Sequence, residues 1–301
     1  MAIMKKTLSA QEFADYLIRS SGKTSDIDFF EEEIQNDSNS NKDSEPIDLL
    51  LLCALPEERD RAFDAFGVAE EDRNRIFQDF RSDFNFIYQK FSYASFSIAV
   101  VTQNTMGMAT ATSLLTRAIL AMNPKLVAMT GICAGRKDKA YLGDIIVADQ
   151  VFDYTAGKRY IDKFAHRPYS FTTDYDIRNY ISTAILNNDG ITDSILESWH
   201  GGRISHRISV HMKALASGTA VIDDQQIMID AASIQDNLYA IDMESYGFAL
   251  AATALRKKWI VIKAVQDYAD GNKEHDETGI RDFSAYASAA LLKKIFPDII
   301  E

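Results

Sequence analysis

Residues 47–58 read I-D-L-L-L-L-C-A-L-P-E-E, and this stretch decides the fold class. The run Ile47–Ala54 is almost continuously apolar, which is typical of a strand buried on both faces of a sheet. A helix is predicted next, over Glu57–Phe66, and it opens with two glutamates, which the helix dipole favours in a first turn. A buried strand followed directly by a helix is the repeating unit of an α/β protein.

The same alternation continues to the C-terminus. Further strands are predicted at Phe84–Tyr88, Phe96–Thr102, Leu126–Thr130, Asp144–Asp149, Leu238–Ile241 and Trp259–Val265. Helices are predicted at Met108–Met122, Ile222–Ala232, Ser245–Arg256 and Phe283–Phe296. Strands that alternate with helices predict a layered α/β fold with a largely parallel sheet.

The first 45 residues differ in composition from the rest. Residues 8–20 carry apolar side chains at helical spacing, and residues 25–45 hold eight acids and one lysine. The polar stretch 36–44 has the composition of a linker. We therefore divide the chain into a short helical segment with an acidic linker, residues 1–45, and a catalytic domain, residues 46–301.

The charge balance limits the partners of this chain. The formal net charge is −12 and the pI is about 4.9, which argues against a nucleic-acid partner and against an anionic membrane. The two cysteines, Cys53 and Cys133, lie in apolar runs and predict buried thiols in a reducing compartment. With neither a secretory leader nor a bilayer-spanning run in the sequence, we expect a cytoplasmic protein.

Several familiar functional motifs are incomplete or absent in this sequence. The stretch Ser20–Thr24, S-S-G-K-T, lacks the earlier glycine of a P-loop and follows a helix. No helix opens after Gly131–Gly135, which excludes a dinucleotide fingerprint. His200, His206 and His211 lack zinc-type spacing, and the sequence contains no G-x-S-x-G elbow. We therefore expect neither a metal nor a cofactor.

Carboxylates follow three of the predicted strands. Glu58 follows the first, Asp242 and Glu244 follow Leu238–Ile241, and Asp267 follows Trp259–Val265. Each has a structural explanation when taken alone, since acids open helices, cap them and close turns. Ligands of open α/β sheets bind at the carboxyl ends of the strands, so their shared placement at that edge favours a site.

Seven short motifs match a known family in the order in which they occur along the chain. They are A-L-P-E-E (54–58), N-T-M-G-M (104–108), T-G-I-C-A-G (130–135), L-G-D-I-I-V-A-D (142–149), S-G-T-A-V-I (217–222), D-M-E (242–244) and D-Y-A-D (267–270). The set resembles the nucleoside phosphorylase/nucleosidase superfamily, above all its 5'-methylthioadenosine/S-adenosylhomocysteine nucleosidase branch. It is also similar to nucleosidase domains of bacterial signalling and defence proteins. The resemblance implies a three-layer α/β/α fold with a central mixed, mostly parallel twisted sheet.

The resemblance also implies roles for individual residues. Asp267 matches the acid that protonates the leaving purine, Glu244 the glutamate that binds the ribose hydroxyls, and Glu58 the glutamate that activates water. Met243 matches a residue that packs on the sugar. The substrate-binding positions implied are Met106, Gly131, Ile132, Cys133, Val221, Ile222, Asp242, Met243 and Gln266.

Four positions depart from the pattern of the closest branch. Val221 replaces an aromatic residue that stacks on the base, Gln266 and Ile132 replace serines, and Asp242 replaces a glutamate. The three reacting carboxylates are unaffected. The departures leave open which group the substrate carries at its 5' position.

Four functions remain in competition. The leading one is hydrolysis of an adenine nucleoside to release adenine, because Glu58 stands where related phosphorylases carry a phosphate loop with arginine. The second is phosphorolysis, with Arg59 and Arg61 as nearby cations. The third is an AMP or ATP nucleosidase that acts as a defence or signalling effector, with phosphate contacts from Lys158, Arg159 and Arg167.

The fourth is a nucleotide-binding module without turnover, which has no need of a water-activating Glu58. For the enzymes, the resemblance implies a homodimer or higher homo-oligomer. Under the effector reading, residues 1–45 would dock a sensor protein.

Overall fold

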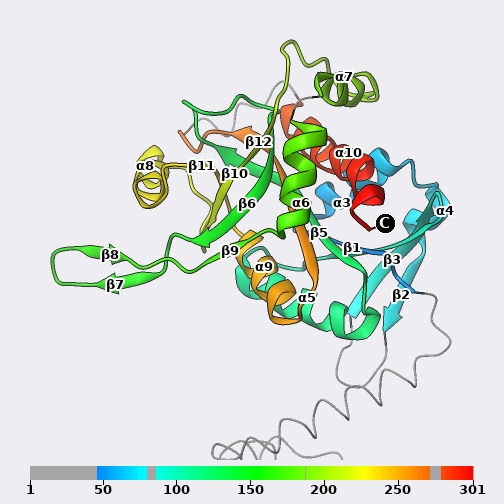
Figure 1. The fold of residues 1–301 in the computed structure, drawn as a ribbon, viewed down its shortest axis with the longest axis horizontal. Coiled ribbons are helices and arrows are strands. Elements are labelled where there is room, and N and C mark those ends of the chain that lie inside the picture. Colours follow the sequence, from blue (N-terminus) through cyan, green and yellow to red (C-terminus); the bar gives the residue numbers. More distant parts are fainter. Residues whose placement is uncertain (1–45, 80–85, 187, 272–278, 301) are drawn as a thin grey trace, which may run out of the picture. The chain divides into compact units, whose positions relative to one another are not determined.

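The computed structural model describes residues 46–79, 86–186, 188–271 and 279–300. The predicted helix at residues 8–20 and the acidic linker lie outside these residues, so the proposed division at residue 45 stays a prediction. Among the described residues, ten strands form one mixed sheet in the order β11-β10-β6-β12-β5-β1-β4-β3-β2, with β9 paired to β6. Figure 1 shows this sheet with helices on both sides.

The strands of this sheet have the following bounds. They are β1 Leu49–Cys53, β2 Ile76–Asp79, β3 Phe86–Tyr93, β4 Phe96–Thr102, β5 Leu126–Gly135, β6 Ile145–Asp153, β9 Ser170–Thr172, β10 Val210–Ser217, β11 Leu238–Asp242 and β12 Lys258–Asp267. β1 lies parallel to both β4 and β5, and β12 is parallel to β5. β11 also pairs antiparallel with β5, which closes β11, β10, β6, β12 and β5 into a ring.

Helices cover both faces of the sheet. The described helices are α3 Pro56–Phe66, α4 Glu70–Asn74, α5 Met108–Met122, α6 Tyr175–Tyr180, the π-helix η1 Ile181–Ile185, α7 Asp189–Glu197, α8 Gln225–Ile234, α9 Ser245–Ala254 and α10 Ile280–Ile300. Leu49 and Leu51 pack in the same cluster as α3 and α10, whereas Leu50 and Leu52 pack with α5 and α9. Because side chains alternate across a strand, one apolar run supplies both cores. The predicted three-layer α/β/α fold is confirmed.

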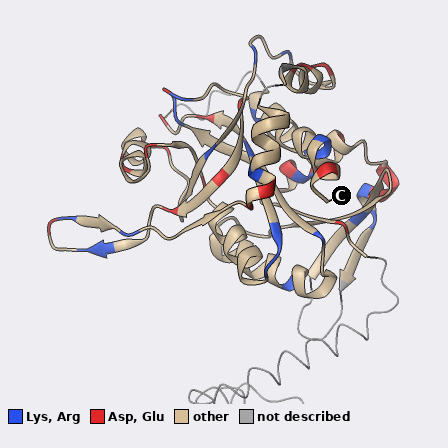
Figure 2. Cartoon of the chain, viewed as in Figure 1, with Lys and Arg blue, Asp and Glu red and all other residues tan. Residues whose placement is uncertain are grey.

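A two-stranded hairpin extends from the sheet. It consists of β7 Gly157–Arg159 and β8 Phe164–His166 (Figure 1). Figure 2 shows lysines and arginines, drawn in blue, on this hairpin. The chain as a whole has a net charge of −12. Lys158 lies 4.9 Å from the ring centre of Tyr160, and Arg159 lies 5.4 Å from that of Phe164.

The structure corrects several predicted bounds. Sequence analysis assigns no element to Val210–Ser217, yet this segment forms β10, a central strand. Its first half is partly exposed and carries polar side chains, which hides the strand pattern. The helix predicted from Ile222 begins instead at Gln225, because the Asp224 carboxylate accepts a bond from Gln226 N and caps it there.

Candidate active site

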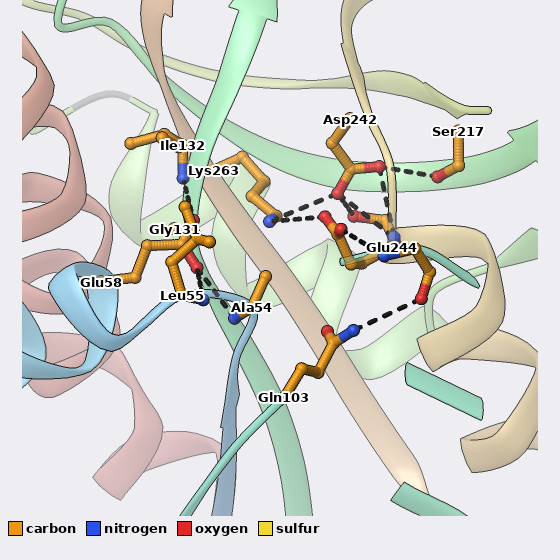
Figure 3. Close-up of polar contacts among 12 residues, drawn as sticks. Ala54, Leu55, Glu58, Gln103, Gly131, Ile132, Ser217, Asp242, Glu244 and Lys263 are labelled. Carbon is orange, nitrogen blue, oxygen red and sulfur yellow. Dashed lines mark hydrogen bonds and ion pairs between the residues drawn. The ribbon is translucent and has the colours of Figure 1, made fainter. Parts of the chain in front are cut away.

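Glu58 lies at the carboxyl end of β1, in the first turn of α3. Its side chain is buried, and three backbone N–H groups hold its carboxylate. Oε2 accepts from Ala54 N at 2.8 Å and Leu55 N at 3.0 Å, and Oε1 accepts from Ile132 N at 2.9 Å. The carboxylate therefore bridges the end of β1 and the middle of β5 in a fixed orientation (Figure 3).

Gly131 provides the space for this carboxylate. Its φ is +151°, and a Cβ at this position would overlap the carboxylate of Glu58. Its N–H donates to Ser288 Oγ of α10 at 3.0 Å, which gives the strand a second contact with the helical layer that carries Glu58. A glycine is required here by both the backbone conformation and the contact with Glu58.

Glu244 lies opposite Glu58, between β11 and α9 (Figure 3). Its side chain is buried, and Oε1 accepts from Gly107 N at 2.9 Å. Burial raises the pKa of Glu244 to about 7, because water no longer solvates its charge. Asp242 and Glu58 raise it further, while Lys263 and the Gly107 N–H lower it.

Asp242, predicted to bind substrate, is surrounded by protein donors. Oδ1 accepts from Ser217 Oγ at 2.7 Å, and both carboxylate oxygens lie 3.2 Å from Ser245 N. Oδ2 accepts from Ser245 Oγ and lies 3.3 Å from Lys263 Nζ. Asp242 thus joins β10, β11, β12 and the start of α9.

Lys263 is a functional candidate that sequence reasoning missed. Its side chain is fully buried, and Nζ lies 3.3 Å from Asp242 Oδ2 and 4.0 Å from Glu244 Oε2. Burial disfavours its charge, but Glu58, Asp242 and Glu244 outweigh that effect and raise the pKa of Lys263 above its usual value. The signal was present in the sequence, as a lysine inside the apolar run W-I-V-I-K-A-V of residues 259–265.

Asp267 lies at the end of β12 and is partly exposed. Oδ1 accepts from Ala269 N at 2.8 Å and Oδ2 from Gln266 Nε2 at 2.9 Å. Cys133 lies within electrostatic reach of Asp267, Asp242 and Glu58, and burial raises the pKa of its thiol well above the usual value. Asp267 therefore lies on the same side of the sheet edge as the buried carboxylates, nearer to solvent.

The other predicted substrate residues divide by exposure. Ile132 and Met243 are partly buried beside Glu58 and Glu244. Met106 is 48% exposed and Val221 is 59% exposed. Ile222 packs against the cluster under α8 rather than against the carboxylates. The structure therefore places Ile132 and Met243 beside the buried carboxylates and leaves Met106 and Val221 at the surface.

Within residues 46–300, apart from the undescribed gaps, no group of three or more His, Cys, Asp or Glu side chains is arranged to hold a metal ion. None of the described helices combines the length and apolarity needed to cross a membrane.

A family model described as the phosphorylase superfamily matches residues 48–301. The chain belongs to the phosphorylase superfamily. The match spans both Glu58 and Asp267, so the candidate site lies wholly inside the superfamily domain.

Two curated proteins resemble this chain in sequence. The uncharacterized protein y4jS of Sinorhizobium fredii is 34% identical over 208 residues, covering 67% of this chain and 50% of that protein. ATP nucleosidase Cap17 of Escherichia coli is 25% identical over 237 residues, covering 75% and 47%. This chain thus spans about half the length of these relatives.

The fold is shared with solved nucleosidase structures. The 5'-methylthioadenosine/S-adenosylhomocysteine nucleosidase of Neisseria meningitidis superposes with a TM-score of 0.61 at 13% identity, over 83% of this chain and 98% of that one. At this identity the likeness establishes the three-layer fold, as predicted from sequence.

Proposed function

We propose that this chain hydrolyses the N-glycosidic bond of an adenine nucleoside and releases adenine. The observation that carries the proposal is the pair of buried carboxylates, Glu58 and Glu244, on either side of the Lys263 ammonium (Figure 3). Superfamily membership and the nucleosidase names of relatives support the same reaction class.

The residues fit the steps of such a hydrolysis. As the bond from C1' to the purine breaks, positive charge develops on the ribose, as in other glycoside hydrolyses. Glu244 accepts bonds from the ribose hydroxyls and stabilises this charge. Glu58 takes a proton from the water whose oxygen attacks C1', and Asp267 gives a proton to N7 of the departing adenine.

Water is preferred to phosphate as the attacking group. Phosphorolysis needs cations to bind a phosphate ion at the site. Arg59 lies 2.8 Å from Asp60 and Arg61 lies 2.6 Å from Asp64, so both candidate arginines are engaged by acids along α3. This pairing supports hydrolysis.

An adenine nucleotide is the second candidate substrate. The Escherichia coli relative is named an ATP nucleosidase, which favours a phosphorylated 5' group and an effector role. The basic hairpin offers phosphate contacts through Lys158, Arg159 and Arg167. The superfamily resemblance implies that Met106 lies near the 5' substituent, and its exposed side chain leaves room for either 5' group.

Chromatographic detection of adenine tests the reaction and the substrate together. The purified chain is incubated with adenosine, methylthioadenosine, AMP and ATP, each with and without phosphate. We expect adenine release that does not need phosphate, from at least one of the four. Strict dependence on phosphate would favour phosphorolysis, and no adenine from any substrate would contradict the proposal.

We also propose a cytoplasmic homo-oligomer whose residues 1–45 dock a sensor. The two free, buried cysteines support a reducing compartment. The superfamily resemblance supports the assembly. Light scattering on the full chain and on a chain lacking residues 1–45 tests the oligomer and the role of that segment.

A further inference from the structure

Asp242 connects the site to four elements of the fold. Ser217 from β10 donates to it, Ser245 at the start of α9 donates through both its N–H and its hydroxyl, and Lys263 from β12 lies 3.3 Å away. Ser217 Oγ also accepts from Tyr246 N at 2.9 Å, which ties the same network to α9 a second time. Both Asp242 oxygens are therefore committed to protein donors.

We infer that Asp242 is a positioning residue that draws the Lys263 ammonium toward itself and away from Glu244, and that the two together set the charge that the Glu244 carboxyl experiences. The inference rests on the proposed function for its effect on catalysis, but not for its effect on Glu244. A carboxylate whose oxygens accept from Ser217 and Ser245 and lie beside the Lys263 ammonium has little left to offer a ribose hydroxyl. Asp242 acts on the reaction through Lys263.

The orientation of Lys263 supports this role. Its Nζ is buried and, among the described residues, makes no hydrogen bond of good geometry, although two carboxylates lie within 4.0 Å. A buried ammonium without hydrogen bonds is costly unless neighbouring charges fix it. Asp242, itself held by Ser217 and Ser245, is the nearer of those two charges.

The groups that face Glu244 come from several elements. They are Glu58 of α3, Asp242 of β11, Lys263 of β12 and the N–H of Gly107 that precedes α5. The Cys133 thiol of β5 lies within electrostatic range of Lys263. One cation thus lies among three carboxylates. Removing the Lys263 charge makes the surroundings of Glu244 more negative, and removing the Asp242 charge makes them less negative.

The two substitutions therefore have opposite expected effects. In Asp242→Asn, one repelling carboxylate is lost and the ammonium is freed to approach Glu244, so Glu244 ionises at lower pH. In Lys263→Met, the attracting cation is lost and Glu244 ionises at higher pH. Lys263→Arg keeps the charge and is expected to keep the titration near that of the wild type.

The decisive experiment is a carboxyl ¹³C NMR titration of the full-length, glutamate-labelled protein without ligand. Loss of the signal in Glu244→Gln assigns the resonance. We expect the midpoint to fall by about one pH unit in Asp242→Asn and to rise by about one unit in Lys263→Met. The control is Asp48→Asn, a buried aspartate paired with Lys125 on another part of the sheet, which should leave the midpoint unmoved.

A purely structural Asp242 gives a different result. Asp242→Asn would then lower the melting temperature without moving the Glu244 midpoint, and this outcome would overturn the inference. If Lys263→Met does not fold, the Asp242→Asn midpoint decides alone. Where adenine release is measurable, the acidic limb of kcat/KM should move with the midpoint, and wild-type inactivity on all four substrates would refute only the proposed function.

Discussion

The carboxylate of Glu58 occupies the space that a side chain at residue 131 would need. Gly131 has a φ of +151°, and the next residue, Ile132, donates its N–H to Glu58 Oε1 at 2.9 Å. The glycine lies in β5 and the glutamate in α3, 73 residues apart in the sequence (131 − 58), and they meet because β5 lies parallel to β1. The orientation of the Glu58 carboxylate, the proposed water-activating group, thus depends on residue 131 having no Cβ.

Replacing Gly131 by alanine is expected to displace Glu58. Adenine release should fall by about 100-fold or more, since small misplacements of a reacting group have effects of this size. Stability should fall by about 1–3 kcal/mol because the new methyl group overlaps a buried carboxylate. The control is Gly67→Ala, at a φ of +71° with nothing within 4 Å of the new Cβ, which should lose stability but keep its rate. An unchanged rate in Gly131→Ala would contradict the assignment of Glu58.

Glu58→Gln should reduce the rate of adenine release by about 10²–10⁴-fold, because glutamine cannot take a proton from water. The fold should be retained with a stability loss of about 1–3 kcal/mol, because the amide oxygen still accepts from Ala54 N and Leu55 N while the amide NH2 faces the Ile132 N–H, a second donor. Glu57→Gln is the matched control, one residue earlier in the same helical turn and exposed to solvent. Stopped reactions analysed by chromatography give both rates, and equal losses in the two variants would remove Glu58 from the mechanism.

Asp267→Asn should affect substrates according to their leaving group. Adenine leaves poorly without protonation, so its release should fall by about 10²–10⁴-fold. A ribose with a nitrophenolate leaving group needs no proton and should be cleaved at close to the wild-type rate. Asp270→Asn, which removes a surface partner of Lys137, serves as the control. Equal losses on both substrates would mean that Asp267 is not the acid.

Glu244→Gln should stabilise the protein at alkaline pH. The folded pKa of Glu244, about 7, lies above its ordinary value of 4.5, so its contribution to stability is fully present below pH 4.5 and is lost as the pH rises through 7. The glutamine variant avoids that loss, by on the order of 1–3 kcal/mol above pH 7. Thermal unfolding from pH 4.5 to 8.5 should show two curves that diverge with pH, while the variant releases little adenine. Parallel curves would contradict the raised pKa.

Much of the fold can be predicted from local patterns. Met108–Met122 and Phe96–Thr102 were predicted with the bounds that the structure has, because long apolar periodicity decides such elements locally. β10 could not be found in this way, since its first half is partly exposed and its partners β6 and β11 are distant in sequence. Residues 84–85 and 8–20, which also carry predictions, lie outside the described residues.

The sequence by itself determined the layered α/β class and the superfamily and predicted the three carboxylates, because strand and helix periodicity and short ordered motifs are local properties of the chain. Only the tertiary structure decided what surrounds those carboxylates. In the folded protein Asp242 accepts hydrogen bonds from Ser217 and Ser245 and lies beside Lys263. The Lys263 ammonium of β12 lies between Glu58 and Glu244. The physical reason is that burial and charge pairing arise between strands distant in sequence, and they exist only once the sheet has formed.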